Sequence, residues 1–319
     1  IHGRAVIRRD CHVEVYTDSG KDYLQAKNII IATGAQARMP DIPGIDLAGV
    51  YGSDQLLGAN SWKFDRIAIV GGGVIGVEMA TIFSSLCSKV TIIEQGSQLL
   101  GPMDQDVARA LEKELKEKGI SVYCDTSVLE ITERSDGLVC RVARDGKEQD
   151  IAAGQVLMAI GRSPYMEGLF GEDVEFEMEK GRLAVNDRFM TSVPGIYAIG
   201  DVVADIQLAH VAAAQGTFVV ENIAGRPHTI QLSVVPNGMY ARLPVVPSCI
   251  YTDPEIATVG LTEEAARANG MRVVCGKYSM GDNGKSIISH ERGGLSIWCL
   301  TPILRSWWGL RSCVQGPRT

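Results

Sequence analysis

The sequence lacks closely spaced pairs of cysteines. None of its eight cysteines forms a CxxC or CxxxxC pair with another, and its five histidines do not cluster beside them. Zinc sites and local redox disulfides are built from such pairs, so both are disfavoured. We therefore expect no bound metal, and mostly buried, reduced thiols of a cytoplasmic protein.

Long apolar runs and an excess of positive charge are missing as well. No apolar run approaches the roughly 18 residues that a membrane-spanning helix needs. The net charge of −7 disfavours binding to nucleic acid. The chain opens with Ile1-His2-Gly3, without a start Met or a basic-then-apolar leader. We expect an internal piece of a longer cytoplasmic protein, with no membrane and no nucleic-acid partner.

The hydrophobic pattern between residues 66 and 159 predicts an α/β domain. Apolar runs at 66–70 and 89–93 indicate buried strands, and helical periodicity from Val74 to about Leu86 connects them. The other elements expected here are a helix over 104–118 and short strands at 120–124, 127–133, 138–143 and 155–159. This order describes a doubly wound sheet with a three-stranded insert.

The flanking regions predict further strands and helices. Residues 1–25 alternate in short pieces and predict an antiparallel meander. Apolar runs at 27–32 and 195–199 end in glycine turns, and a helix rich in small residues is expected over 208–223. A last region is expected to hold a strand at 248–252 and a helix at 262–269. With 319 residues, of which 45% are hydrophobic, the chain suffices for two domains and part of a third.

A glycine-rich turn, GGGVIG, links the strand at 66–70 to the following helix. Gly71 permits a tight turn, Gly73 lets the backbone approach a pyrophosphate, and Gly76 lets helix and strand pack closely. The free N–H groups of the helix N-terminus would bind the phosphates. A GxGxxG alone is a weak signal, because such turns also join strands to helices without a ligand. Here the turn follows a predicted strand and opens a predicted helix, and a second predicted strand comes after the helix. We therefore infer nucleotide binding.

Glu94 ends the second strand, about 20 residues after the turn, where dinucleotide-binding units carry an acid. A carboxylate at this place accepts hydrogen bonds from both ribose hydroxyls, and it would repel a 2′-phosphate. The sequence therefore favours NAD over NADP.

Three more glycine turns follow strands, at Gly34, Gly161 and Gly200. Each alone is more often a plain turn, but together they suggest a second ligand. Asp201 follows a strand where open α/β sheets bind ligands, and its carboxylate could hold polyol hydroxyls. The helix that begins near Leu208 could direct its N–H groups at a second pyrophosphate. For His210, near that helix start, a structural role is favoured over a chemical one.

The order of these turns resembles that of one enzyme family. The stretches ATG, GGGVIGVE, AIGRSP and GIYAIGDV follow one another as in the flavin-dependent pyridine nucleotide–disulfide oxidoreductases. Residues 207–212, 250–257 and 259–263 are most similar to the branch that oxidises dihydrolipoyl groups. The resemblance covers roughly residues 1–289. It implies FAD and NAD as cofactors, a homodimer, and a lipoyl-bearing protein as substrate.

The resemblance also implies two sets of cofactor-binding residues. The FAD set is Thr33, Gly34, Ala35, Asp201, Gln207, Leu208, Ala209 and His210. The NAD set is Gly71, Gly72, Gly73, Val74, Ile75, Gly76, Val77, Glu78 and Glu94, with Val128 at the adenine pocket and Gly161 near the nicotinamide. No catalytic residue is assigned. The family's first GxGxxG unit and its CxxxxC redox pair match nothing in this sequence, and His290-Glu291 is a poor match for its C-terminal acid–base pair.

The implied fold is α/β, with two Rossmann-like domains for FAD and NAD(P), the FAD one incomplete, and a truncated α+β dimerisation domain. The expected boundaries are 1–60 for the first piece of the FAD domain, 61–185 for the NAD domain, 186–240 for the second piece of the FAD domain, 241–289 for the start of the dimerisation domain and 290–319 for an aberrant tail.

This tail departs from the family pattern. Residues 295–319 hold three of the four tryptophans and show no clean period. One interpretation is a divergent loop. Another is a shifted reading frame, because the codons of Trp307-Trp308-Gly309, read one base earlier, encode Val-Gly within a strand-like sequence. A shifted frame would leave the tail without a selected packing partner, and we would then expect disorder.

The full-length function expected from the resemblance is NAD-dependent oxidation of dihydrolipoyl groups in 2-oxo acid dehydrogenase or glycine cleavage systems. For this chain alone we expect weak NAD binding at best and no dithiol turnover. Two other interpretations stay open. One is a related flavoenzyme, such as a mercuric reductase, a soluble transhydrogenase or an NADH oxidase, and the other is a non-enzymatic, truncated gene product.

Overall fold

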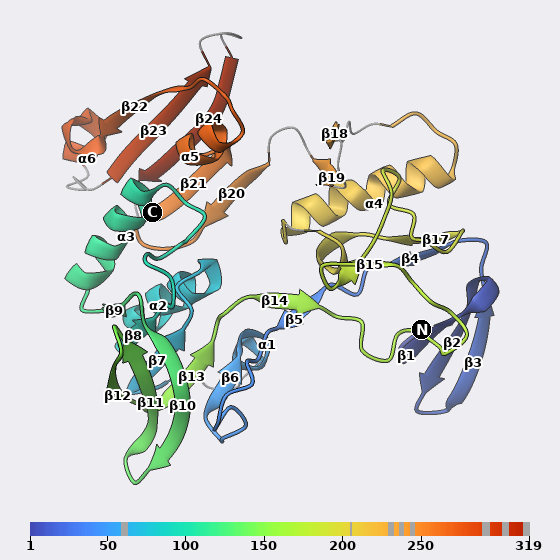
Figure 1. Cartoon of the computed structure of the whole chain (residues 1–319), viewed down its shortest axis with the longest axis horizontal. Coiled ribbons are helices and arrows are strands. Elements are labelled where there is room, and N and C mark those ends of the chain that lie inside the picture. The colour runs from blue at the N-terminus through green and yellow to red at the C-terminus, as the bar shows by residue number, and fades with distance from the viewer. Residues whose placement is uncertain are drawn as a thin grey trace. The chain divides into compact units, whose positions relative to one another are not determined.

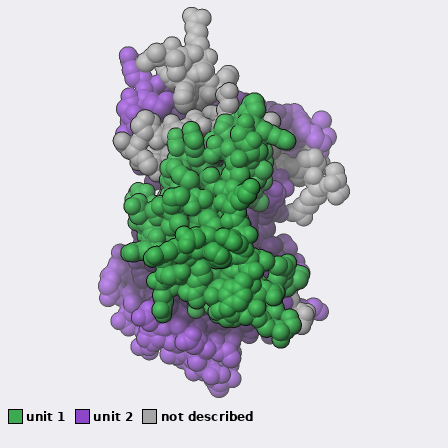
Figure 2. Space-filling view, turned by 90° about the vertical axis from the view of Figure 1, so that its right-hand side faces the viewer, with its two compact units in different colours: residues 1–36, 162–246 green, residues 37–161, 247–319 purple. Residues whose placement is uncertain are grey.

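The chain forms two compact units in the computed structural model (Figures 1 and 2). One unit consists of residues 1–36 and 162–246, the other of residues 37–161 and 247–319. Each unit thus combines two stretches that lie far apart in the sequence. The structure describes residues 1–58, 63–204, 206–228, 233–235, 239–242, 246–288, 294–301 and 306–314. Within these ranges, no helix is long and apolar enough to cross a membrane.

A five-stranded parallel sheet in the order β6–β13–β7–β8–β9 forms the centre of the second unit. Its strands are β6 (Val50–Gly52), β7 (Arg66–Val70), β8 (Lys89–Ile93), β9 (Ser121–Tyr123) and β13 (Gln155–Met158), and the helices beside it are α1 (Ser53–Leu57), α2 (Val74–Ser85) and α3 (Gln105–Glu117). The strand order reverses at β7, with β8 on one side and β13 on the other. Such a reversal is where open α/β sheets bind ligands.

Both faces of this sheet are covered. Ile67 and Ile69 of β7 belong to a core cluster that includes side chains of α2 and α3. Ala68 and Val70 belong to a second cluster, which includes side chains of the insert. Successive side chains of a strand point to opposite faces, so a strand covered on both sides must be apolar along its length. This explains the nearly continuous apolar run that predicted β7.

The insert is an antiparallel sheet in the order β10–β11–β12. Its strands are β10 (Ser127–Arg134), β11 (Gly137–Arg144) and β12 (Lys147–Ala153). The predicted strands at 127–133 and 138–143 are confirmed, but the strand predicted at 120–124 is β9 of the parallel sheet. The third strand of the insert, β12, was not predicted, because its first four residues are exposed and polar and only Ile151 and Ala153 are buried.

A second five-stranded sheet, β20–β21–β24–β23–β22, also belongs to this unit. The elements of this part are β20 (Pro247–Ile250), β21 (Glu255–Gly260), α5 (Glu263–Ala268), β22 (Val274–Ser279), the 3-10 turn η3 (Met280–Asp282), α6 (Gly284–Ile288), β23 (Gly294–Thr301) and β24 (Ser306–Val314). The strand and helix predicted at 248–252 and 262–269 are confirmed. The expectation of a tail without packing partners is wrong for β23 and β24, because β24 pairs with β21 and β23 pairs with β22. The shifted frame stays a hypothesis, and His290-Glu291 lies outside the described residues.

The cysteines differ from the expectation of mostly buried, reduced thiols. Cys275 of β22 and Cys299 of β23 face each other in register and form a disulfide. Cys87 and Cys249 are exposed, whereas Cys140 is buried. Sequence spacing could not reveal the disulfide, because its cysteines are 24 residues apart and become neighbours only when the strands pair. Burial raises the pKa of the Cys140 thiol to about 12, which keeps it protonated.

The first unit contains the predicted meander. β1 (Arg4–Arg8), β2 (His12–Thr17) and β3 (Gly20–Gln25) are antiparallel neighbours, and β4 (Ile29–Ile31) pairs in parallel with β17 (Ile196–Ala198). Its long helix is α4 (Ala209–Ile223), as predicted. The remaining elements are η1 (Arg9–Cys11), β5 (Ala35–Ala37) paired with β14 (Arg162–Pro164), β15 (Met178–Glu179) paired with β16 (Arg182–Leu183), η2 (Gly200–Val202), and β18 (Ser233–Val235) paired with β19 (Met239–Arg242).

A charged cluster holds the meander together around Glu14, whose residue surface is 9% exposed. Its carboxylate accepts hydrogen bonds from Arg8 Nη2 at 3.0 Å and Tyr16 Oη at 2.9 Å, and lies 2.9 Å from Lys21 Nζ. The hydrogen bonds from Lys21 and Arg8 lower the pKa of Glu14 from 4.5 to about 2. The ionised form is therefore strongly preferred in the folded chain.

This cluster predicts an acid-sensitive contribution to stability. Because the folded pKa is depressed, the contribution is fully present above pH 4.5 and is lost as the pH falls towards about 2. Denaturant unfolding at pH 7, 4 and 2.5 should show Glu14→Gln less stable than the wild type at pH 7, with a difference that shrinks as the pH falls. Glu167→Gln, at an exposed position, serves as the control. A pH-independent difference for Glu14→Gln would contradict this account.

Candidate functional site

The turn after β7 is fixed sterically at two of its glycines. Gly71 has a φ of +111°, and a Cβ added there would lie 2.4 Å from the carbonyl oxygen of Ala159. A Cβ added at Gly76 would lie 2.0 Å from the carbonyl oxygen of Gly71. A side chain at Gly71 would overlap the main chain that follows β13, and one at Gly76 would push the start of α2 away from the end of β7. These two glycines are thus required by packing, whether or not a ligand binds.

Gly73 differs from both of these glycines. It is the N-cap of α2, its φ is −73°, and a Cβ added there would meet no heavy atom within 4 Å. Neither backbone strain nor packing inside the chain requires glycine here. The open space lies at a helix N-terminus, whose first N–H groups have no partner within the helix. A pyrophosphate fits this space and this charge.

The Glu94 carboxylate is held beside the turn by two backbone groups. Its Oε2 accepts a hydrogen bond from Gly72 N and its Oε1 from Gly96 N, each at 2.5 Å. The main chain of Glu94 also accepts from Thr126 N at 2.9 Å. The acid is therefore oriented at the end of β8. The sequence indicated Glu94 but not its contact with Gly96, which the sequence shows only as a glycine two residues after the acid.

A buried loop at Leu99 and Leu100, which no sequence pattern indicated, also supports the turn. Leu100 N donates to Gly72 O at 2.8 Å, and a Cβ added at Gly72 would lie 2.5 Å from Leu99 Cδ2. Both leucines are at most 2% exposed. The loop thus fixes the middle of the turn from the side of the core.

The other residues of the predicted NAD set differ in burial and in what they contact. Val77 is buried, and Val74 is 42% exposed at the start of α2. Glu78 Oε1 accepts from Tyr251 N at 2.8 Å, so this carboxylate contacts the end of β20 rather than the turn. Ile75 is half-buried against the core.

Gly161 follows a strand of the parallel sheet, whereas Val128 lies in a strand of the insert. Gly161 follows β13, and because Ala159 N donates to Val70 O at 2.7 Å, it lies at the same edge of the sheet as the glycine turn. Its φ is +113°, and a Cβ added there would meet nothing within 4 Å. Val128 lies in β10, partly buried against the second core cluster. The structure therefore brings the glycine turn, Glu94 and Gly161 to one sheet edge, whereas Glu78 contacts the end of β20 and Val128 lies in the insert.

In the first unit, the ends of β4 and β17 bring much of the FAD set together. Ile31 pairs with Ala198, and Ile199 N donates to Ile31 O at 3.0 Å, so the two strands end side by side. Thr33 and Gly34 follow β4, and Asp201 follows β17. Gly34 has a φ of +73° and open space at its Cβ position.

Two further observations concern the start of α4. The Gln207 side-chain nitrogen is buried and has no hydrogen-bond partner among the described residues, and Leu208 is the N-cap of α4. Ala209 and His210, in the first turn of α4, are exposed. An unpaired buried donor costs free energy unless a ligand supplies an acceptor. Thr33, Ala35 and Asp201 are partly or fully accessible.

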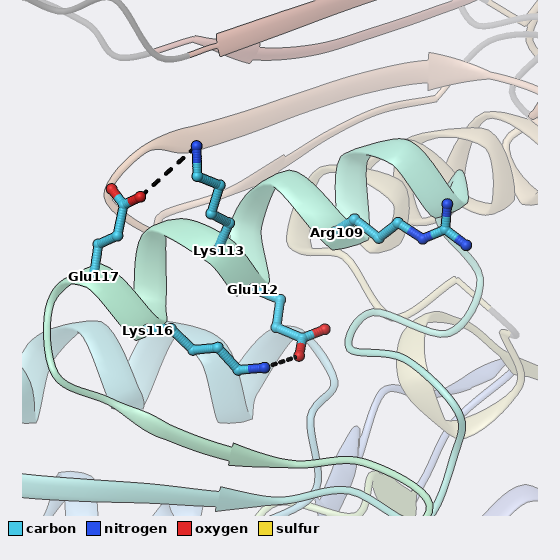
Figure 3. A pocket seen from close by; sticks show the side chains of 5 residues that line it. All are labelled: Arg109, Glu112, Lys113, Lys116 and Glu117. Atoms are coloured by element: carbon cyan, nitrogen blue, oxygen red, sulfur yellow. Dashed lines mark hydrogen bonds and ion pairs between the residues drawn. The ribbon is translucent and has the colours of Figure 1, made fainter.

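The hollow drawn in Figure 3 lies elsewhere, on the surface of α3. Its volume is about 450 Å³, and its lining is entirely charged: Arg109, Glu112, Lys113, Lys116 and Glu117. Lys116 pairs with Glu112 at 2.6 Å and Lys113 with Glu117 at 3.7 Å, one helical turn apart. Such exposed pairs contribute little to stability and mark a solvated helix face. None of the predicted site residues lines it.

Glycine turns at the carboxyl ends of parallel strands in both units define a dinucleotide-binding α/β protein. Residues 2–216 match the pyridine nucleotide-disulphide oxidoreductase family, and residues 246–296 match its dimerisation domain. The chain belongs to this family. The resemblance inferred from the sequence is thereby confirmed.

The chain spans little more than half the length of its curated relatives. Dihydrolipoyl dehydrogenase of Bacillus subtilis (strain 168) is 38% identical over 278 residues, which are 86% of this chain and 56% of that protein. Dihydrolipoyl dehydrogenase 3 of Pseudomonas putida is 34% identical over 282 residues, 88% of this chain and 58% of that protein. Among solved structures, the HOCl-induced flavoprotein disulfide reductase RclA from Escherichia coli is similar with a TM-score of 0.84 and 25% identity, covering 98% of this chain and 68% of that one.

The glycine turn yields a prediction that separates packing from ligand binding. Gly76→Ala should destabilise the chain by roughly 1–3 kcal/mol, because its Cβ would overlap the Gly71 carbonyl. Gly73→Ala should cost less than about 1 kcal/mol, the loss typical of an N-cap, because its Cβ would enter open space. Urea unfolding of the two variants measures this difference. Equal losses of stability would show that Gly73 is also a packing residue.

Proposed function

We propose that this chain is part of an FAD-dependent dihydrolipoyl dehydrogenase that uses NAD as the electron acceptor. The observation that carries the proposal is the pairing of an open helix N-terminus at Gly73 with the oriented Glu94 carboxylate at the same sheet edge. Two relatives named dihydrolipoyl dehydrogenase, at 38% and 34% identity, support the choice of substrate.

In this proposal, α2 and Glu94 bind different parts of NAD. The first N–H groups of α2 bind the pyrophosphate, and the absence of a side chain at Gly73 lets it approach. Glu94 accepts hydrogen bonds from the adenosine ribose hydroxyls. Because Gly72 and Gly96 already orient its carboxylate, little side-chain entropy is lost when the sugar binds. The same negative charge opposes a 2′-phosphate.

The first unit would hold FAD at the ends of β4 and β17. Asp201 would bind the ribityl hydroxyls, the start of α4 would direct N–H groups at the phosphates, and Gln207 would donate to an oxygen of the ligand. Thr33, Gly34 and Ala35 would lie along the flavin, where Gly34 leaves space. Bound FAD would supply the electron transfer between a dithiol and NAD.

The dimerisation-domain match supports a homodimer as the working state. Exposed apolar side chains on β22 and β23 agree with this: Val274 is 62% exposed and Trp298 40%. We propose a lipoyl-bearing protein as the substrate of the complete enzyme, in the cytoplasm. The likeness to RclA favours a second candidate, a flavin-linked reductase of a different disulfide. Turnover of dihydrolipoamide and of other disulfides by a full-length copy separates the two.

The NAD assignment predicts a specific loss of affinity. Calorimetric titration of a folded, full-length copy should show NADH binding more tightly than NADPH. Glu94→Ala should weaken NADH binding by roughly 10- to 100-fold, because it removes hydrogen bonds to a charged group. It should also reduce the preference for NADH over NADPH. Asp125→Asn, which removes an exposed charge close by, is the matched control and should leave both affinities unchanged.

Two results would contradict the assignment. One is the absence of NADH uptake by a full-length copy whose circular dichroism shows that it is folded. The other is a Glu94→Ala variant that binds NADH as well as the wild type does.

A further inference from the structure

A buried glutamine of α4 contacts the turn that carries Asp201. Gln215 is 2% exposed, and its Oε1 accepts a hydrogen bond from Gly200 N at 2.7 Å. Gly200 opens the 3-10 turn η2, which contains Asp201. No sequence pattern indicates a role for Gln215, because a glutamine in a helix rich in small residues carries no signal of its own.

Small residues on the same helix face bring α4 close enough for this contact. A Cβ added at Gly200 would lie 3.2 Å from Ala212 Cβ, and one added at Gly216 would lie 3.4 Å from Ile199 Cδ1. Residues 212, 215 and 216 are spaced i, i+3 and i+4, which places them on one face of a helix. The helix therefore approaches the end of β17 with two small residues and one side chain that reaches the main chain.

Within the described part of the chain, Gln215 is the one acceptor for the Gly200 N–H, so the turn depends on this hydrogen bond. Gly200 has a φ of +72°, and its carbonyl oxygen accepts from Val203 N at 3.0 Å and Ala204 N at 2.9 Å. Its N–H points instead to Gln215. A buried N–H without an acceptor is costly, so a turn that loses Gln215 should shift to bring this group to water.

We propose that Gln215 is a positioning residue that sets the spacing between Asp201 and the start of α4. Leu208, the N-cap of α4, and Gln215 are about two turns apart on one helix, which moves as a rigid element. A single hydrogen bond from that helix to Gly200 therefore fixes Asp201 relative to the free N–H groups of the helix start. The inference rests on the proposed function, because these two groups are the proposed contacts for the ribityl chain and the phosphates of FAD.

The test uses three variants of a full-length copy, because the family's first GxGxxG unit matches nothing in this sequence. Gln215→Met keeps the volume and removes the acceptor, and Gln215→Glu keeps an acceptor oxygen. Val219→Ala is the control for a general loss of packing, because Val219 is fully buried on the same helix, in a core cluster with Phe189 that includes none of the described residues of η2. The two measurements are amide hydrogen exchange at Gly200, relative to Ile199, and FAD affinity by fluorescence titration.

Gln215→Met should speed the exchange of the Gly200 amide by roughly tenfold or more relative to Ile199, and should weaken FAD by a similar factor. Gln215→Glu should keep the slow exchange of the Gly200 amide that the wild type shows. Val219→Ala should lower global stability while leaving the ratio of the two exchange rates and the FAD affinity near the wild-type values.

The outcomes separate this inference from the proposed function. Unchanged exchange in Gln215→Met overturns the hydrogen bond as the fixing contact, and faster exchange with unchanged FAD affinity overturns the positioning role. Equal weakening of FAD by Val219→Ala also overturns it. If the folded, full-length wild type takes up no FAD, the flavin assignment fails and the positioning role fails with it. If the wild type binds FAD and Gln215→Met binds it equally well, only the inference fails.

Discussion

The close approach of Gly76 to the carbonyl oxygen of Gly71 is the constraint on which the nucleotide site depends. With hydrogen as the only side chain at position 76, α2 begins directly against the end of β7. This contact places the first N–H groups of α2 at the sheet edge where Glu94 follows β8. A larger residue would displace the helix start, and the open space at Gly73 would no longer lie beside the acid.

The first unit reaches a similar arrangement by different means. There the strand ends of β4 and β17 lie side by side, and the turn at Gly200 is tied to its helix by the side chain of Gln215. In the second unit the helix is placed by steric exclusion, and in the first by a buried hydrogen bond. A steric contact tolerates no side chain, whereas a hydrogen bond requires a particular one. The two sites should therefore respond differently to substitution.

Long, regular elements were predictable, and short or polar ones were not. Apolar runs or helical spacing predict β7, β8, α2 and α4. Burial on both faces of a strand, or on one stripe of a helix, requires apolar residues at regular positions. β12 escaped prediction because only one end of it is buried. The Cys275–Cys299 disulfide escaped it because strand pairing, not local spacing, makes the two residues neighbours.

The sequence by itself determined the family, the glycine turn and the acid at Glu94, because each of these depends on a local pattern of residue types. It also determined which glycines to examine, but not why each is glycine. Only the tertiary structure decided that Gly71 and Gly76 meet main-chain atoms while Gly73 faces open space. Likewise, only the structure paired Gln215 with Gly200 and Gly72 with Glu94. Such contacts depend on how separate segments pack against each other, and no local pattern records that.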